Sequence, residues 1–215
     1  MTPRSVEMRP TSPDDPARRR DADRSRSQIL DAAEALFAEK GYEGTSLREI
    51  GERAGTSRGT PAYFFDSKDG LYEAVLDRAF GRAQEQVEAA RDRAQGGGIE
   101  ALLSELVGSY LDFLSANPTF IRLVERESLG GGQRLARNMP HLAALEAGLQ
   151  AARSQHTLID DPRHVLLSVM GMCWFPLSQS GTLLPALGLD ARDPEFLAAR
   201  KRHIVSLLLH GLSLR

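Results

Sequence analysis

The stretch Ser57–Phe65, SRGTPAYFF, brings an arginine, hydroxyl groups and aromatic rings close together. Guanidinium and hydroxyl groups donate hydrogen bonds, and aromatic rings offer flat contact area. Pro61 and Phe65 are four positions apart, so on a helix they share one face and would pack against neighbouring helices. The side chains left beside or outside that face are Arg58, Gly59, Thr60, Tyr63 and Phe64. We interpret this combination as a surface that contacts another molecule.

Residue types that serve catalysis or metal binding occur elsewhere, but their spacing does not favour either. The histidines form no HExxH or other short metal-binding spacing, and there is no GxSxG motif or phosphate loop. Cys173 is the only cysteine, so it cannot form an internal disulfide. We therefore expect no catalysis, no bound metal and no cofactor. The five histidines are His141, His156, His164, His203 and His210.

Composition and charge limit the remaining classes of function. Lys and Arg number 27 against 29 Asp and Glu, a formal net charge of −2, so any contact with nucleic acid must come from a local surface. No apolar run reaches the roughly 18 residues of a membrane span. The first residues are charged and contain no apolar core of a secretory signal. We expect a cytoplasmic protein with no membrane partner.

The elements that would position the contact surface begin with a helix after Ser25. Apolar residues recur at i, i+1, i+4, i+7 and i+8 from Ile29, which predicts a helix with one buried stripe. Lys40 places a cation in the last turn, and Gly41 accepts the positive φ that often follows a helix. We expect this helix to end at these two residues.

Two short helices should follow. Either Thr45 or Ser46 can cap the second helix, and Glu49 completes a capping box with Ser46. Gly55 breaks the chain before Ser57, which is expected to cap the third helix. Two short helices joined by a tight glycine turn, with a longer helix before them, form a helix-turn-helix unit.

The third helix is expected over residues 57–65. With Ser57 as its cap, Pro61 falls at the end of the first helical turn, where the missing amide donor costs little.

The rest of the chain also shows helical patterns and no strand alternation. Asp161 before Pro162 and Asp193 before Pro194 are strong signals for helix starts. We predict an all-α protein with a disordered tail at 1–22, a helix-turn-helix domain at 23–68 and a larger helical domain at 69–215. The helices expected beyond the third are 68–94, 99–116, 118–129, 140–155, 162–178 and 194–212.

The segments QILDAAEALFAEKGY and GTSLREIGERAGTSRGTPAYFFDSKDGLYEAVL resemble the DNA-binding domain of the TetR family of transcriptional regulators. The resemblance covers about residues 25–76. It implies a ligand-responsive regulator, most often a repressor, that binds double-stranded DNA as a homodimer. The third helix of each subunit would enter the major groove of a palindromic operator, and a small-molecule effector would release the protein.

The resemblance also implies roles for individual residues. Arg48 is a candidate for a base edge or a phosphate, Lys68 for the DNA backbone, and the second helix start at Thr45 and Ser46 for phosphates, although capping alone would also explain both hydroxyls. The residues that match the reading surface are Ser57, Arg58, Gly59, Thr60, Tyr63 and Phe64. Arginine can bond guanine O6 and N7, and aromatic or methyl groups can touch the thymine methyl.

Two positions depart from the family pattern. Pro61 stands where the family usually has a large aliphatic residue, and Ala62 where it usually has a tyrosine that touches phosphate. Tyr63 is then a substitute for that hydroxyl, with either a base or a phosphate as its partner.

The larger domain would supply dimerisation and effector binding. Helices 162–178 and 194–212 carry more apolar residues than one buried stripe needs, and by resemblance they would pair with their copies as a four-helix interface. A monomeric core is the alternative. An apolar or amphipathic effector would lie among aromatic and apolar side chains. The candidate pocket residues are Tyr110, Phe113, Phe120, Met139, Trp174 and Phe175.

Two further questions stay open at this level. The arginine-rich segment 17–27, ARRRDADRSRS, is either a solvated charge run or an arm that reaches phosphates or a minor groove. The N-terminal module could also contact protein instead of DNA, in which case duplex binding that weakens steeply with salt would be absent.

Overall fold

The computed structural model describes residues 16–135, 142, 146, 149, 150 and 161–213. All regular elements in this part of the chain are helices, which confirms the predicted all-α class. They are α1 (Pro16–Lys40), α2 (Leu47–Arg53), α3 (Thr60–Phe65), α4 (Lys68–Arg93), α5 (Gly98–Ala116), α6 (Pro118–Leu129), α8 (Pro162–Ser178), α9 (Leu183–Ala186) and α10 (Pro194–Ser213).

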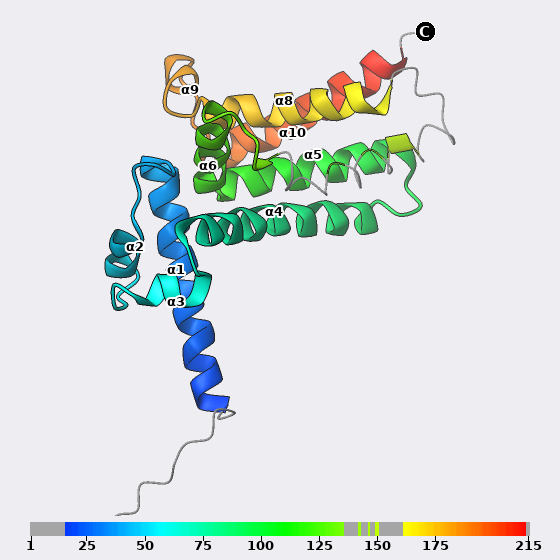
Figure 1. Ribbon diagram of the computed structural model, residues 1–215. Coiled ribbons are helices and arrows are strands. Elements are labelled where there is room, and N and C mark those ends of the chain that lie inside the picture. Colours follow the sequence, from blue (N-terminus) through cyan, green and yellow to red (C-terminus); the bar gives the residue numbers. More distant parts are fainter. Residues whose placement is uncertain (1–15, 136–141, 143–145, 147–148, 151–160, 214–215) are drawn as a thin grey trace, which may run out of the picture.

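Helices α1, α2 and α3 pack together as the N-terminal module, and the start of α4 packs against them (Figure 1). The stripe predicted on α1 is buried: Ile29, Ala33 and Phe37 are all fully covered. The helix ends as expected, with Lys40 in its last turn and Gly41 at φ +75°. Lys40 and Gly41 therefore predicted the C-terminal end of α1 correctly.

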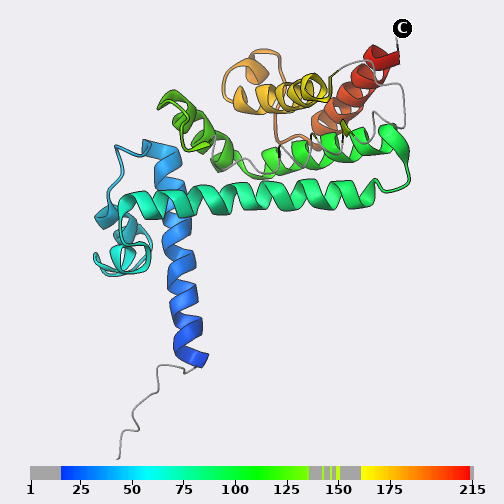
Figure 2. The same ribbon diagram turned by 45° about the vertical axis from the view of Figure 1, so that its right-hand side comes forward.

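The first helix begins earlier than predicted. It starts at Pro16 instead of near Ser25, so residues 16–22, assigned to a disordered tail from the sequence, are helical. Proline is well suited to the first position of a helix, and alanine and arginine are good helix formers. The charged turns of α1 project beyond α3, away from the rest of the molecule (Figures 1 and 2).

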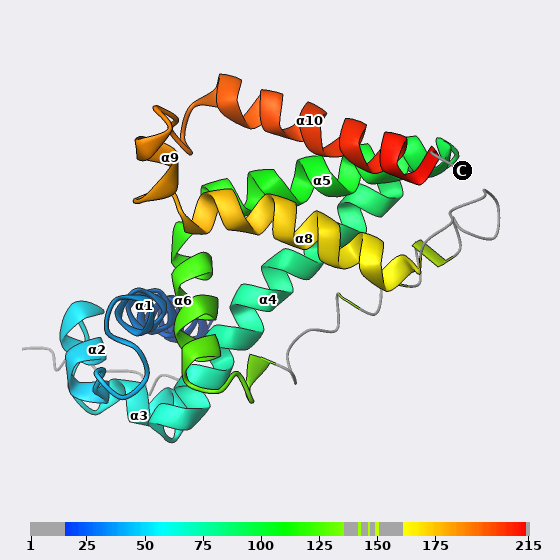
Figure 3. The ribbon, with the colours of Figure 1, turned by 90° about the horizontal axis from the view of Figure 1, so that it is seen from above.

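The larger part of the protein consists of stacked helical layers. Helix α4 runs alongside α5, and α8 and α10 lie over the opposite side of α5 (Figures 1 and 3). Helix α6 lies between this body and the N-terminal module, because it contacts α1 on one side and both α5 and α8 on the other. Leu71, Leu76, Leu103 and Leu111 are fully buried in the core that runs through the layers.

Both aspartate–proline signals mark helix starts as predicted. Asp161 accepts a 2.9 Å hydrogen bond from the amide of Arg163, and Asp193 accepts one of 2.9 Å from the amide of Glu195. The short α9 was not predicted, and most of the helix expected at 140–155 lies outside the described residues. Within the described chain, no helix combines the length and apolar character needed to cross a membrane.

Candidate nucleic-acid interface and ligand pocket

The start of α2 separates the roles of two neighbouring hydroxyls. Ser46 caps the helix, because its hydroxyl accepts a 3.2 Å hydrogen bond from the amide of Glu49. Thr45 is only 3% exposed, and its hydroxyl lies 2.8 Å from the carbonyl of Gly41 and 3.3 Å from that of Leu36. Thr45 therefore fastens α2 to the end of α1. The prediction that Thr45 contacts phosphate with its side chain is corrected, whereas that for Ser46 stays a prediction.

The turn between α2 and α3 depends on two glycines. Gly55 has φ +66°, and the amides of Gly55 and Thr56 bond back to the carbonyls of Glu52 and Gly51, a Schellman arrangement. Gly51 allows the returning chain to come close, because a Cβ at this position would lie 3.1 Å from the carbonyl oxygen of Ser57. The predicted helix-turn-helix unit is present. Gly55 provides the positive φ of its turn, and Gly51 leaves room for the returning chain.

Helix α3 is shorter than predicted. It begins at Thr60, so Pro61 occupies the first turn, where no intrahelical amide bond is lost. Ser57 does not cap a backbone amide; its hydroxyl lies 2.6 Å from that of Thr60, and Gly59 occupies the cap position. The inward face is as predicted, because Pro61 and Phe65 are both buried.

The opposite side of α3 and the turn before it form an open surface, which we call the α3 surface: Ser57, Arg58, Gly59, Thr60 and Tyr63. Tyr63 is 82% exposed, and the first three of these residues are also exposed, while Thr60 is partly covered. A tyrosine this open forgoes the apolar contacts that its ring would gain by burial.

Phe64 differs from its neighbours. It is half-buried, packs against the hydrophobic core and contacts both Tyr63 and Phe65, with ring centroids 5.3 Å and 6.4 Å away. Phe64 therefore lies between the outward surface and the core, and its contact with DNA stays a prediction.

A single carboxylate balances the two arginines nearest the α3 surface. Glu52 accepts a 3.0 Å hydrogen bond from Arg48, one turn earlier on α2, and lies 3.4 Å from Arg58. Each of the three side chains is about half exposed or more, so solvent screens the attraction between their charges. Two cations are thereby held together on the surface without being buried.

Lys68, at the first position of α4, is partly covered. Its ammonium lies 4.2 Å from the centre of the Tyr42 ring, which Arg134 also approaches, at 4.6 Å. The phenol of Tyr42 has a raised pKa, because it is partly desolvated and because it bonds to the carboxylate of Asp69. Lys68 is therefore positioned by an aromatic ring next to the N-terminus of α4, where a cation opposes the helix dipole.

Glu49 pairs with Lys40 across the junction of α1 and α2. The Lys40 ammonium holds the pKa of the Glu49 carboxyl below its usual range, and the Ser46 amide adds to this effect. The end of α1 and the start of α2 are therefore joined by a charge pair as well as by the Thr45 hydroxyl.

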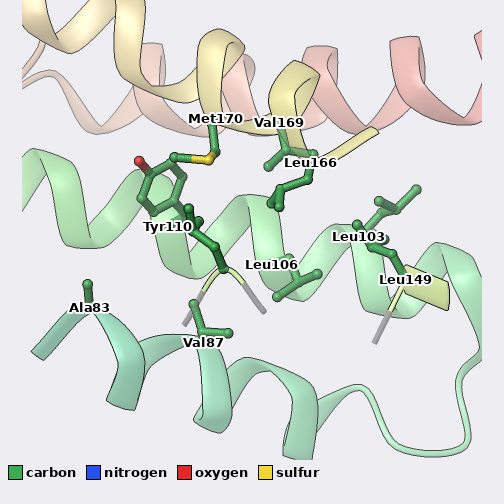
Figure 4. A pocket seen from close by; sticks show the side chains of 10 residues that line it. Ala83, Val87, Leu103, Leu106, Tyr110, Leu149, Leu166, Val169 and Met170 are labelled. Carbon is green, nitrogen blue, oxygen red and sulfur yellow. The ribbon is translucent and has the colours of Figure 1, made fainter. Parts of the chain in front are cut away.

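The larger domain contains a pocket bounded by α4, α5, α6 and α8. Its wide part has a volume of about 620 Å³. A smaller apolar cavity of about 30 Å³ shares Ala83, Tyr110 and Met170 with the wide part. Its lining residues come from α4, α5 and α8 and from Leu142 and Leu149 between α6 and α8 (Figure 4). The wide part is lined by Phe80, Ala83, Tyr110, Phe120, Val124, Glu125, Ser128, Leu129, Met170 and Trp174.

Three of the predicted pocket residues, Tyr110, Phe120 and Trp174, line this pocket. Phe113 does not, because it is buried in the core behind Phe120, with ring centroids 5.1 Å apart. Phe175 is 56% exposed and belongs to the outer side of α8. Both predictions are corrected, and Met139 lies outside the described residues.

The pocket residues that the sequence analysis missed come mainly from α4 and α6. They include Phe80 and Ala83 on α4 and Glu125 and Ser128 on α6. Apolar residues recur at helical spacing on both α4 and α6, but this spacing does not show whether they face a solid core or a cavity.

Burial keeps two ionisable groups near the pocket neutral. Desolvation raises the pKa of the Tyr110 phenol well above its ordinary value, and it raises the pKa of the Cys173 thiol to about 12. The Cys173 side chain is fully covered, so it is an unreactive core thiol at neutral pH. In the described part of the chain, no cluster of three His, Cys, Asp or Glu side chains is placed to hold a metal ion.

Helix α6 joins the pocket to the N-terminal module. Phe120, Glu125 and Ser128 line the pocket, while Arg126 on the same helix donates a 2.8 Å hydrogen bond to the carbonyl of Ala38 and another to that of Glu39 at the end of α1. These carbonyls belong to the last turn of α1 and have no partner within their own helix. Helix α6 therefore contributes to the pocket wall and is also hydrogen-bonded to the end of α1.

A second connection runs between α1 and α4. Glu34 is 8% exposed and accepts hydrogen bonds of 2.7 Å from Arg78 and 2.6 Å from Arg82. Arg78 also bonds Asp31 at 2.6 Å. A carboxylate that is nearly buried and doubly bonded fixes α1 against α4.

The outer faces of α8 and α10 remain uncovered by other described helices (Figures 1 and 3). Leu167 and Phe175 on α8 are 65% and 56% exposed, and Leu207 on α10 is 51% exposed. Gly171 lies between the two α8 residues and is also exposed. On α8 these residues are four positions apart, so they form one stripe on the helix.

Two family models match the chain. One, described as bacterial regulatory proteins, tetR family, matches residues 29–75, and the other, described as tetracyclin repressor-like, C-terminal domain, matches residues 100–208. The first covers the second half of α1, all of α2 and α3, and the start of α4. The second spans most of the larger helical part.

Similar proteins also align over most of the chain. The HTH-type transcriptional repressor NicS of Pseudomonas putida is 29% identical over 204 residues, which are 91% of this chain and 95% of that protein. The HTH-type transcriptional repressor KstR of Mycolicibacterium smegmatis is 30% identical over 143 residues, 65% of this chain and 68% of that protein.

Solved structures show the same fold. The fatty acid degradation regulator FadR from Bacillus halodurans has a TM-score of 0.70 and 21% identity, with 89% of this chain and 97% of that chain covered. FadR from Bacillus subtilis, solved in complex with stearoyl-CoA, has a TM-score of 0.68 and 19% identity, with 86% of this chain and 98% of that chain covered.

Proposed function

The chain belongs to the TetR family of bacterial regulatory proteins, and we propose that it is a repressor that binds a palindromic operator as a homodimer and is released by a small molecule. The curated relatives NicS and KstR are named as HTH-type transcriptional repressors, which supports repression over activation. It would act on chromosomal DNA in the cytoplasm.

The observation that carries this proposal is the exposure of Tyr63. Its side chain is 82% exposed, on a short helix whose other face, at Pro61 and Phe65, is buried. An exposed aromatic ring on α3 and a guanidinium in the turn before it fit the major groove, where they can contact a thymine methyl and a guanine edge. Ser46, Arg48, Ser57, Gly59, Thr60 and Lys68 complete the proposed DNA contacts.

The charges of this face are suited to exchange with phosphates. Arg48 and Arg58 share Glu52 in the absence of DNA, and both pairs are exposed. A phosphate brings a full negative charge and releases counterions from the duplex, so it competes effectively for either arginine. We propose that on DNA one or both guanidiniums leave Glu52.

The outer faces of α8 and α10 are the proposed dimer interface. Leu167, Phe175 and Leu207 would be covered by the same residues of a second copy, which forms an isologous contact. Two symmetric α3 surfaces about 34 Å apart would then match a pseudo-palindromic site. We retain the division into domains 23–68 and 69–215 as a proposal, although α4 continues through the boundary.

The pocket is the proposed effector site, and α6 is the proposed link from it to DNA. An effector that fits only one position of α6 would favour one orientation of α1 through Arg126. The two subunits would then hold their α3 surfaces at a spacing that either fits the operator or does not.

Selection of bound fragments from a random pool of DNA duplexes tests the proposal. We expect enrichment of an inverted repeat and binding that weakens steeply with salt. Sedimentation of the free protein should show a dimer. A protein that remains monomeric and enriches no sequence would contradict the proposed function.

A further inference from the structure

We propose that the effector of this pocket is an organic cation, with an alkylated or protonated nitrogen carried on an apolar body. This inference rests on the proposed function, because it assigns a ligand class to the proposed effector site. It is drawn from the kinds of side chain that line the wide part of the pocket.

Aromatic rings form much of the pocket wall. Phe80, Phe120 and Trp174 meet edge to face, with centroids 5.3 Å apart for the first two and 6.0 Å for the last two. Tyr110 adds a fourth ring, which the wide part shares with the smaller cavity (Figure 4). The face of an aromatic ring attracts a cation, and several rings around one cavity select alkylated ammonium groups.

Among the residues that the structure describes, Glu125 carries the only charged side chain that lines the pocket. It is partly buried, and among the described residues it has no ion-pair partner. The cations on the same helix point elsewhere: Arg126 bonds the end of α1, and Arg122 lies 3.4 Å from the Thr119 hydroxyl. An unpaired carboxylate beside aromatic rings favours a positive ligand and opposes a negative one.

The neighbouring polar group points to the same class. The hydroxyl of Ser128 donates its proton to the Val124 carbonyl at 2.8 Å, so only its lone pairs remain for a ligand. Glu125 and Ser128 therefore both act as acceptors, which suits a donor such as a protonated amine.

The smaller apolar cavity defines the rest of the ligand. Leu103, Leu106 and Val169 line it together with other apolar side chains, and Tyr110 is its main polar residue (Figure 4). This cavity accepts a slim apolar substituent and offers no counter-charge. The ligand is therefore amphipathic, with its charge near α6 and its apolar part directed between α4, α5 and α8.

Three probes with the same apolar chain separate charge from hydrophobicity: decyltrimethylammonium, decanol and decanoate, each kept below its micelle concentration. Trp174 is the only tryptophan and lines the pocket, so its emission reports occupancy, and calorimetry gives the dissociation constants. We expect the cation to bind about tenfold more tightly than decanol, as one charge-assisted contact provides, and decanoate to bind most weakly.

The matched variants are Glu125→Gln in the pocket and Glu85→Gln on an exposed position of α4 outside it. Glu125→Gln should weaken binding of the cation about tenfold and leave decanol within about twofold. Glu85→Gln, which changes the net charge equally, should leave all three affinities unchanged. Thermal unfolding of each variant checks that the fold is intact.

Tight binding of decanoate, equal binding of the cation to both variants, or failure of every probe to bind would overturn the inference. In the first two cases the pocket remains an effector site for another ligand class. A different result would contradict the proposed function itself, namely that the protein enriches no operator from the DNA pool. Loss of operator binding on addition of decyltrimethylammonium would support both together.

Discussion

The hydroxyl of Tyr72 on α4 donates a 2.8 Å hydrogen bond to the carboxylate of Glu127 on α6. Both side chains are buried, at 2% and 8% exposure. Burial, together with this bond to the carboxylate, raises the pKa of the Tyr72 phenol well above its ordinary value. The pair connects the helix that follows the N-terminal module to the helix that lines the pocket.

Replacement of Tyr72 by Phe should destabilise the protein. The change removes the donor and leaves the Glu127 carboxylate with weaker contacts to Arg134, so we expect a loss of about 1–3 kcal/mol in the free energy of unfolding. Urea denaturation followed by circular dichroism measures it. Tyr63→Phe, at an exposed position, is the control and should leave the stability unchanged. Equal stability of the two variants would show that the buried bond contributes nothing.

Replacement of Arg126 by Met should loosen the end of α1. Arg126 bonds two carbonyls of the last turn, and their loss should lower stability by about 1 kcal/mol. Hydrogen exchange should become faster at the amides of residues 38–44, where α1 joins α2. Arg122→Met on the same helix is the control, because the hydrogen bond of Arg122 goes to Thr119 within α6. Unchanged exchange at 38–44 would argue against α6 as the link to the N-terminal module.

Replacement of Tyr63 by Ala should reduce discrimination among DNA sequences. If the exposed ring contacts a base, its loss costs about 1–3 kcal/mol on the selected operator and little on random duplexes. Lys68→Ala, at a proposed phosphate contact, should instead weaken binding to all sequences alike. Mobility-shift titrations on both kinds of duplex distinguish the two. A uniform loss for Tyr63→Ala would assign the ring to the backbone.

Replacement of Glu52 by Gln should strengthen binding to all duplexes. The change removes a negative charge from the proposed DNA face and frees Arg48 and Arg58 for phosphates. We expect the plot of log affinity against log salt concentration to become steeper, by at most the amount that about one additional phosphate contact produces. Glu73→Gln, an exposed residue of α4, is the matched charge control. A lower affinity for the operator alone would indicate that Glu52 reads a base.

Replacement of Leu167 and Leu207 by Glu should produce monomers. Two charges in the proposed interface would have to be desolvated without partners, which opposes association. Sedimentation equilibrium measures the change, and operator affinity should fall with it because each half-site binds weakly alone. Leu129→Glu, at a position that is 90% exposed on α6, should remain dimeric. A dimeric double variant would exclude the outer faces of α8 and α10.

The helices themselves could be predicted because their signals are local. The stripe on α1, the Ser46 cap, the positive φ of Gly41 and Gly55, and Asp161 before Pro162 each depend on neighbours within a few residues. The start of α3 was misjudged because Pro61 tolerates several positions in a first turn. The quoted segments also sufficed to recognise the family.

The assignment of side chains to core, pocket or surface was decided by tertiary structure. Thr45 and Ser46 are adjacent hydroxyls with the same local propensity, but only Thr45 lies against the end of α1. Phe113 and Phe120 are both apolar aromatics on neighbouring helices, and only Phe120 reaches the cavity. Glu125 stands out only once three other helices surround it. The sequence alone placed most of the helices, because their signals depend on contacts along the chain, although it missed the first turns of α1 and the short α9. The pocket depends on how distant helices pack.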